Sequence, residues 1–341
     1  MPILSLFNHK GGVSKTTTTY HLGWMLANNG YKTLIVDTDP QCNLTSLIIG
    51  DDEAENFYSG KDCIDIYSCI EPLEKGMLGG VKKANPIPTK NSNLFLLCGN
   101  LKLSGFENQL AFALTASEGI PAVRNMPGSL SEVLRAAKKD NAFDYVLIDM
   151  SPSVGALNQC LFMSSDYFLV PTTPDFFCKQ AIKSLSEVIP NWNNTINPFR
   201  KDGLAYSIPV EPPKFIGFLS QKYRPRSNAP AKSFQKWIDI IHTSVNEELV
   251  PVLAKENMIV NTQGKEYLFE NGEPYNIVNI SDFNSLIAQS QKHKTPVFEL
   301  EDAEIEQSGK ILVNMKKSQR DFLNVFEGFA NNIVGLTRSS V

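Results

Sequence analysis

The sequence has no apolar stretch near the roughly 18 residues that a membrane-spanning helix needs. It enters an apolar run at residues 3–7 directly, without the charged and apolar segments of a signal peptide. Its six cysteines form no C-x-x-C pair, which argues against a thiol-held metal or a disulfide framework. We therefore expect a cytoplasmic protein with reduced cysteines. They are Cys42, Cys63, Cys69, Cys98, Cys160 and Cys178.

The chain also lacks an excess of positive charge, since its formal net charge is −4 and its isoelectric point lies near 5.7. This balance excludes a globally basic nucleic-acid-binding protein. The 341 residues are 42 % hydrophobic and 20 % charged, which is typical of a globular chain. No repeat and no linker rich in Pro, Gly or Ser divides it, so we expect a single domain over residues 1–341. Segments near 51–92 and 251–276 carry no motif; we interpret the first as a variable connection and the second as a loop or short hairpin.

The most informative segment is residues 9–17, which read His-Lys-Gly-Gly-Val-Ser-Lys-Thr-Thr and follow the apolar run. Adjacent glycines let the backbone turn tightly and direct several N–H groups inward, and a helix predicted to begin near Thr16 adds its positive N-terminal end. Such a loop is a cradle for the phosphates of a nucleotide. Lys15 is placed to reach the β- and γ-phosphates, and the Thr16 hydroxyl is placed to bind Mg²⁺.

A second motif follows the apolar run at residues 33–36, which is typical of a buried parallel strand. This strand is predicted to end in Asp37-Thr38-Asp39-Pro40, where the proline stops it. Carboxylates at the C-terminal end of a strand can point at metal-bound phosphate. Asp37 and Asp39 are therefore candidate site residues.

A third motif, at residues 145–149, consists of four apolar residues that end in Asp149. It looks like a Walker B strand, whose carboxylate holds Mg²⁺ through a water because Mg²⁺ prefers oxygen ligands and keeps several waters. An aspartate after an apolar strand is a weak signal alone, but it is specific together with the other two motifs.

The three segments resemble the ParA/MinD family of deviant Walker A ATPases, whose motifs read K-G-G-x-x-K-[ST], D-x-D-P-Q-x-N and roughly I-D-x-P-P-S. Ser14 replaces the usual glycine of the first motif. The resemblance implies that Lys10, the family's early lysine, crosses a dimer interface to touch the partner's nucleotide. It also implies that Asp39 orients or activates the attacking water and that Asp37 lies just outside the ligands of Mg²⁺.

The predicted site follows from these motifs and from residues 166–174, which resemble the family's next strand and loop. The predicted nucleotide contacts are Lys10, Gly11, Gly12, Val13, Ser14, Lys15, Thr16, Thr17 and Pro174. The predicted Mg²⁺ site consists of Thr16, Asp37 and Asp149, and the predicted catalytic residues are Lys10, Lys15 and Asp39.

Further apolar runs at residues 94–97, 168–171 and 215–219 alternate with helical or long connecting sequence. This alternation predicts the α/β class: a doubly wound, mostly parallel sheet with helices on both faces, as in a P-loop NTPase. The candidate residues lie just past the C-terminal ends of predicted strands, which is the edge where open α/β sheets bind ligands.

Residues 212–238 contain no acidic residue and six basic ones. Such a stretch can neutralise backbone phosphates and give salt-sensitive, sequence-independent DNA binding. In DNA-partitioning members of the family, basic residues toward the C-terminal part bind DNA once ATP has closed the dimer. A solvated basic face, or lysines near the nucleotide base, is the alternative. The basic residues are Lys214, Lys222, Arg224, Arg226, Lys232 and Lys236, and all but Lys214 are predicted DNA contacts.

An apolar stripe at helical spacing predicts a further helix near residues 316–335. MinD-type relatives end in an amphipathic helix that targets membranes, so the stripe has two interpretations. Packing on the domain is favoured over membrane binding because the polar face has no row of lysines. The stripe consists of Phe322, Val325, Phe326, Phe329 and Ile333, and the polar face carries Glu327, Asn331 and Asn332.

The resemblance favours the ParA branch. It implies a slow, partner-stimulated ATPase that uses ATP and Mg²⁺, forms a homodimer in the ATP state and then binds nonspecific DNA for plasmid or chromosome partition. A ParB-like adaptor and association with the nucleoid are implied in the same way. The alternatives are a MinD-like positioning ATPase that binds membrane, and a metabolic ATP-dependent carboxylate ligase of the dethiobiotin-synthetase kind. Lys10 and Asp39 argue against the ligase, because they belong to the dimeric switch group.

Overall fold

The computed structural model describes residues 2–60, 64–77, 80–116, 120, 123–226 and 229–338. Cys63 lies outside the described residues, as do parts of the variable segment at 51–92. The side chain of Arg226, one of the predicted DNA contacts, also lies outside them.

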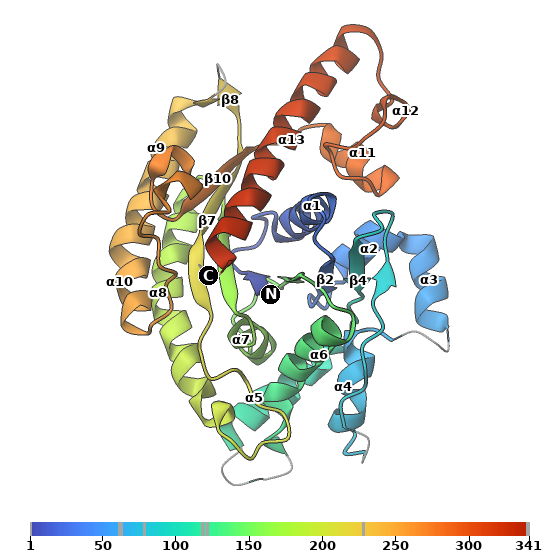
Figure 1. The fold of residues 1–341 in the computed structure, drawn as a ribbon, viewed down its shortest axis with the longest axis vertical. Helices are drawn as coiled ribbons and strands as arrows, with labels where there is room; N and C mark the ends of the chain where they lie inside the picture. Colours follow the sequence, from blue (N-terminus) through green and yellow to red (C-terminus); the bar gives the residue numbers. More distant parts are fainter. Residues whose placement is uncertain are drawn as a thin grey trace.

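An eight-stranded sheet forms the centre of the described chain, in the order β10-β7-β6-β1-β5-β2-β4-β3 (Figure 1). Its neighbouring strands are parallel, except that the short β3 runs antiparallel to β4. The predicted fold, a doubly wound P-loop NTPase sheet, is confirmed. The strands are β1 (Ile3–Leu6), β2 (Thr33–Asp37), β3 (Ile87–Pro88), β4 (Leu94–Leu97), β5 (Tyr145–Asp149), β6 (Tyr167–Thr172), β7 (Lys214–Tyr223) and β10 (Asn276–Ser281), while β8 (Pro225–Arg226) and β9 (Ala229–Pro230) form a separate ribbon.

Helices cover both faces of the sheet because its central strands are apolar on both sides. In β1, for example, Ile3 belongs to one buried core, and Leu4 and Leu6 belong to the other. The first core is covered by α4 (Ile66–Glu74), α5 (Leu103–Ala116), α6 (Met126–Asp140), α7 (Ala156–Met163), α8 (Phe176–Ile196), α9 (Lys232–Ser244) and α10 (Val250–Lys255). The second is covered by α1 (Lys15–Asn28), α2 (Asn43–Ile49), α3 (Asp51–Ser59), α11 (Leu286–His293), α12 (Asp302–Ile305) and α13 (Gly309–Thr337).

The long helix α13 buries most of the apolar stripe found in the sequence. Phe322, Phe326, Phe329 and Ile333 lie in the second core, where α13 packs against α1 and β10. Figure 1 shows α13 passing beside α1 and reaching past it toward α12. None of the described helices is both long and apolar enough to cross a membrane.

The sheet extends beyond the predicted strands at both edges, with the two-residue β3 at one and β10 at the other. The sequence does not predict β10, because Asn279 interrupts its apolar residues and no long apolar run results. Strand β7 continues to Tyr223, four residues past the predicted end at Leu219, and so carries Gln221 and Lys222 to the C-terminal edge of the sheet. Within the segment 251–276, α10 continues to Lys255, Ile259 forms a β-bridge with Phe215, and 3₁₀ turns follow at Glu266–Leu268 and Glu270–Gly272.

Candidate functional site

The phosphate loop joins β1 to α1 and contains two residues in the left-handed conformation. The backbone angle φ is +75° at Gly12 and +57° at Ser14. Glycine adopts this conformation at no steric cost, whereas serine has a side chain to accommodate. The carbonyl oxygen of Ser14 accepts the N–H of Thr18 at 2.9 Å and the hydroxyl of Thr18 at 2.8 Å. These bonds hold the loop in shape where the family usually has glycine.

The side chain of Lys15 folds back inside the loop. Its Nζ donates to the carbonyl oxygen of Asn8 at 2.8 Å and, more weakly, to that of Lys10 at 3.5 Å. Burial lowers the pKa of Lys15, and the carboxylates of Asp149 and Asp39 oppose this shift. The ammonium group therefore lies within the loop, where bound phosphates would need a positive charge.

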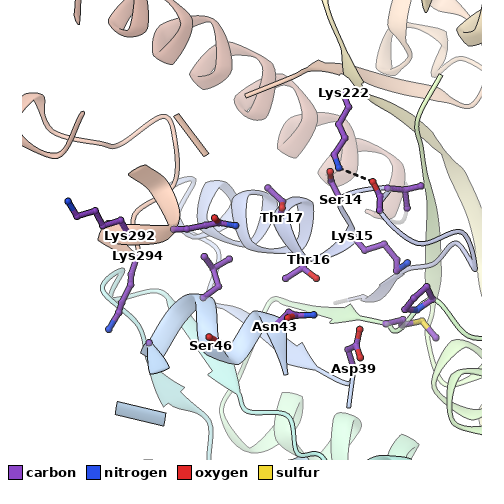
Figure 2. A pocket seen from close by; sticks show the side chains of 17 residues that line it. Ser14, Lys15, Thr16, Thr17, Asp39, Asn43, Ser46, Lys222, Lys292 and Lys294 are labelled. Atoms are coloured by element: carbon purple, nitrogen blue, oxygen red, sulfur yellow. Dashed lines mark hydrogen bonds between the residues drawn. The ribbon is translucent and has the colours of Figure 1, made fainter. Parts of the chain in front are cut away.

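A cavity of about 680 Å³ opens beside the loop, within the size range of small-molecule sites (Figure 2). Figure 2 shows Lys15, Thr16 and Asp39 at one end and Lys292 and Lys294 at the other. The cavity is lined by Gly12, Val13, Ser14, Lys15, Thr16 and Thr17 of the loop and α1, by Asp39, Asn43, Ser46, Leu47 and Gly50 of the β2–α2 region, by Met150 and Pro152 after β5, by Lys222 of β7, and by Gln291, Lys292 and Lys294 at the end of α11.

Two of the predicted acids lie opposite each other at the ends of neighbouring strands. Asp37 of β2 pairs in register with Asp149 of β5. The carboxylate of Asp37 accepts the N–H of Thr45 at 2.8 Å and its hydroxyl at 2.7 Å, while burial raises the pKa of Asp37 to about 6. Burial also raises the pKa of Asp149 well above its usual value, and nearby Asp37 adds to this shift.

The surroundings of Asp149 fit a Mg²⁺ ion. Both carboxylate oxygens of Asp149 are buried and have no hydrogen-bond partner within the described part of the chain. The hydroxyl of Thr16, which interacts with the carboxylate too weakly to satisfy either oxygen, and the positive charge of Lys15 partly oppose the rise in the pKa of Asp149. Because buried polar atoms are normally satisfied and Mg²⁺ prefers oxygen ligands, a divalent cation suits this position.

Asp39 differs from the other two acids because it lines the cavity. Its Oδ1 accepts the N–H of Gln41 at 2.9 Å, and its own N–H donates to Oδ1 of Asp37 at 3.2 Å. These bonds orient the turn after β2. The structure thus brings Lys15, Thr16, Asp39 and Asp149 together at one edge of the sheet.

Lys10 lies at the same edge but outside the cavity. Its Nζ donates to Oγ1 of Thr173 at 2.8 Å and to Oδ2 of Asp175 at 2.5 Å. Asp175 also caps the N-terminus of α8, since its Oδ1 accepts the N–H of Cys178 at 3.0 Å. Pro174, a predicted nucleotide contact, is buried between these partners and does not line the cavity.

The predicted DNA contacts do not form one group. Lys222 points at the phosphate loop, where its Nζ donates to the carbonyl oxygen of Gly12 at 2.9 Å, which agrees with the alternative of a lysine near the nucleotide (Figure 2). Arg224 is exposed just past β7, and Lys232 and Lys236 are exposed on α9.

A smaller cavity of about 350 Å³ adjoins the first, between the ends of β7 and β10 and the start of α11. Ser14, Thr17, Lys222 and Gln291 line both cavities. The smaller one is completed by Gln221, Ser281, Asp282, Phe283 and Ile287.

Several residues around the site have no motif to identify them. Asn8 holds the loop, because its side chain accepts the N–H of Lys10 at 2.9 Å and donates to the carbonyl oxygen of Pro171 at 2.9 Å. Asp175 could have been found as a capping residue, since an aspartate before an apolar helical run is a helix-start signal. Gln291, Lys292 and Lys294 come from a distant part of the chain and give no local signal.

Comparisons with known proteins agree with this geometry. The AAA_31 family model, described as an AAA domain, matches residues 1–201. An uncharacterized protein of Methanocaldococcus jannaschii is 28 % identical over 236 residues, which are 69 % of this chain and 79 % of that protein. The chromosome partitioning protein ParA of Caulobacter vibrioides is 29 % identical over 197 residues, which are 58 % of this chain and 65 % of ParA. The chain thus spans just under two thirds of the length of ParA.

A solved structure extends the likeness of fold over the whole chain. The complex of Cyanothece McdA with ATP has a TM-score of 0.61 at 16 % identity, and the match covers 100 % of this chain and 99 % of McdA. The family model covers more than half of the chain, and the phosphate loop, the acids and the parallel sheet all lie where such a fold requires them. The chain therefore belongs to the AAA_31 family, within the ParA/MinD group of P-loop ATPases.

Proposed function

We propose that the chain is a slow ATPase of one domain that binds ATP and Mg²⁺, dimerises in the ATP state and then binds nonspecific DNA. The observation that carries the proposal is the different placement of two lysines of one loop. Lys15 lies buried inside the loop, whereas Lys10 lies outside the cavity with its ammonium on Thr173 and Asp175. Lys15 is suited to the nucleotide of its own chain, and Lys10 to the nucleotide of a partner.

The residues around the phosphate loop support a role in ATP hydrolysis. The loop amides and Lys15 would bind the phosphates, and Thr16 and Asp149 would hold Mg²⁺ with Asp37 behind them. Bound Mg²⁺ would neutralise charge that develops on the phosphate oxygens. Asp39, which faces the cavity, would orient a water for in-line attack on the γ-phosphate. Since phosphoryl transfer depends mainly on positioning, such a site can turn over slowly until a partner completes it.

The smaller cavity offers room for the nucleoside. Phe283 and Ile287 give it apolar walls, and Gln221, Asp282 and Gln291 give it hydrogen-bonding groups. The phosphate loop forms the border between the two cavities, so a nucleotide could place its phosphates in the larger one and its base in the smaller one. The bound ATP of McdA, a protein of similar fold, supports this proposal.

Exposed cations support the DNA-binding part of the proposal. Arg224, Lys232 and Lys236 are exposed near the end of β7 and on α9. Lysine and arginine side chains of this kind bind backbone phosphate without reading sequence. By analogy with the partitioning relative, the cellular role would be movement of plasmid or chromosomal DNA on the nucleoid with a ParB-like adaptor.

The test is binding to a nonspecific DNA duplex with ATP, with ADP and without nucleotide, at several salt concentrations. We expect the protein to bind the duplex only when ATP is present. Its affinity for DNA should fall as the salt concentration rises. Lys15→Ala is the control, because it should remove nucleotide binding and DNA binding together. Co-sedimentation with anionic lipid vesicles is measured in parallel. A protein that binds ATP and lipid but never DNA would support the MinD-like alternative instead.

A further inference from the structure

The last residues of β7 hold the phosphate loop from the side of the smaller cavity. Gln221 is buried; its Nε2 donates to the carbonyl oxygen of Val13 at 3.0 Å, and its Oε1 accepts the hydroxyl of Thr18 at 2.9 Å. The ammonium of the next residue, Lys222, donates to the carbonyl oxygen of Gly12 at 2.9 Å, drawn as the dashed line in Figure 2. Two consecutive carbonyl groups of the loop are therefore held by two consecutive side chains of one strand.

This arrangement determines where the amides of the loop point. In a trans peptide, the C=O of one residue and the N–H of the next share a plane and point in opposite directions. The peptides from Gly12 to Ser14 are trans. Holding the carbonyl oxygens of Gly12 and Val13 therefore turns the N–H groups of Val13 and Ser14 to the other side of the loop. Successive N–H groups that face one side form a concave site for an anion.

The backbone at Lys222 supports a specific role for this contact. Lys222 has a φ of +60°, an uncommon conformation for a residue with a long side chain. Lys222 is exposed to solvent, yet its ammonium donates to the carbonyl oxygen of Gly12 in the loop. Gly12 on its own would leave the loop free to adopt several conformations, because glycine is the most permissive residue. A clamp on its carbonyl group removes that freedom before any ligand arrives.

We infer that Gln221 and Lys222 are positioning residues, which hold the peptides of Gly12 and Val13 so that the loop presents its amides to phosphate before the nucleotide binds. This inference rests on the proposed function, since it assumes that the loop binds the phosphates of ATP. Neither residue needs to touch the nucleotide for this role. Both residues also line the smaller cavity, so direct contact with the base is the competing explanation to be tested.

The experiment uses the full chain with two probes, ATP and inorganic pyrophosphate, which has phosphates but no base. Affinity for fluorescently labelled ATP with Mg²⁺ is measured directly, and affinity for pyrophosphate by competition. The variants are Gln221→Met and Lys222→Met. The matched control is Lys255→Met, which likewise removes the charge of an exposed lysine, but at the end of α10, where the residue lines neither cavity. Thermal unfolding without nucleotide reports any general loss of structure.

We expect both variants to reduce the affinity for ATP and for pyrophosphate alike, by about ten-fold. This is the effect of losing a hydrogen bond when its acceptor is left unsatisfied. Lys255→Met should keep both affinities within about two-fold of those of the unmodified chain. An equal loss in Gln221→Met excludes a simple effect of charge, because glutamine is neutral. Lys222→Met changes an exposed side chain, so its unfolding midpoint should match that of the control. This variant tests the inference even if Gln221→Met fails to fold.

Two results would overturn the inference. If ATP binds more weakly but pyrophosphate does not, the residues act on the base. If neither affinity changes, the clamp has no role in binding. Failure of the proposed function looks different: the unmodified chain would then bind neither probe, or Lys15→Ala would bind ATP as well as the unmodified chain.

Discussion

The ammonium group of Lys10 lies 2.5 Å from the carboxylate of Asp175 in the same chain. Burial acts to raise the pKa of Asp175, but hydrogen bonds from Lys10, Thr173 and the N–H of Cys178 outweigh it and hold that pKa below its usual value. The side chains of Lys10 and Asp175 remain partly exposed, at 23 % and 40 %. Partly exposed ion pairs stabilise a protein by at most about 1 kcal/mol, so breaking the contact between Lys10 and Asp175 costs little free energy. Under the proposed function, Lys10 must leave Asp175 before it can reach the nucleotide of a partner.

The first prediction separates the two lysines of the loop. Lys15→Ala should weaken ATP binding by about 10- to 100-fold, because it removes a hydrogen bond from a charged group. Lys10→Ala should leave binding to the monomer unchanged but prevent ATP-dependent dimerisation. Nucleotide titration and sizing chromatography with ATP measure the two effects. Normal dimerisation and hydrolysis by Lys10→Ala would remove this lysine from the interface.

The second prediction concerns the contact between Lys10 and Asp175. Asp175→Asn should strengthen the ATP-dependent dimer by up to about five-fold, because it frees Lys10 from an ion pair worth at most about 1 kcal/mol. Asparagine is as good a helix cap as aspartate, so α8 should keep its N-terminus. Sedimentation equilibrium at several protein concentrations gives the dimer constant. A weaker dimer would mean that Asp175 stabilises the interface itself.

The contact between Lys10 and Asp175 also illustrates what the sequence could and could not predict. Lys15, Asp37 and Asp149 each follow an apolar strand, and the C-terminal ends of parallel strands meet at one edge, so their proximity was predictable. Lys10 and Asp175 are 165 residues apart, and no periodic pattern links them. Such a pair depends on how β1 and β6 lie side by side, which only the folded chain reveals.

Lys222 is a second residue whose contact could not be predicted from the sequence. In the sequence it belongs to a basic stretch without acids, and composition alone cannot tell which lysines face solvent. The extension of β7 to Tyr223 carries Lys222 onto the loop instead. A local pattern predicts charge, but the register of the strand decides what that charge touches.

The third prediction tests the role of Asp39. Asp39→Ala should slow ATP hydrolysis by about 100-fold or more, in the range for loss of a group that positions or activates the nucleophile. ATP binding should change little, because Lys15 and the loop amides remain. Single-turnover hydrolysis and the lifetime of the ATP-bound dimer are measured together, and the dimer should persist longer. If the rate of hydrolysis were unchanged, a residue other than Asp39 would position the attacking water, and Asp37 would be the next candidate.

The fourth prediction separates the basic residues by their placement. Replacing Lys232 and Lys236 of α9 by Ala should reduce the magnitude of the salt slope of DNA binding by about 0.9 per lost phosphate contact. Lys222→Met should leave the slope unchanged at saturating ATP, because its ammonium lies on Gly12. Filter binding over a range of salt concentrations gives the slopes. Equal slopes for the α9 variant and the unmodified chain would exclude this face from the DNA site.

The fifth prediction concerns the apolar stripe of α13. The ring of Phe326 is fully buried and lies 5.3 Å from the ring of His21 on α1 and 5.5 Å from that of Phe298, measured between centroids. Phe326→Ala should therefore lower the free energy of unfolding by about 3–5 kcal/mol. Leu323→Ala, one turn away and 38 % exposed, is the control and should cost under about 1 kcal/mol. Denaturant titration measures both. A helix that leaves the domain to bind lipid would give the opposite pattern: Phe326→Ala would barely change stability but would reduce co-sedimentation with anionic vesicles.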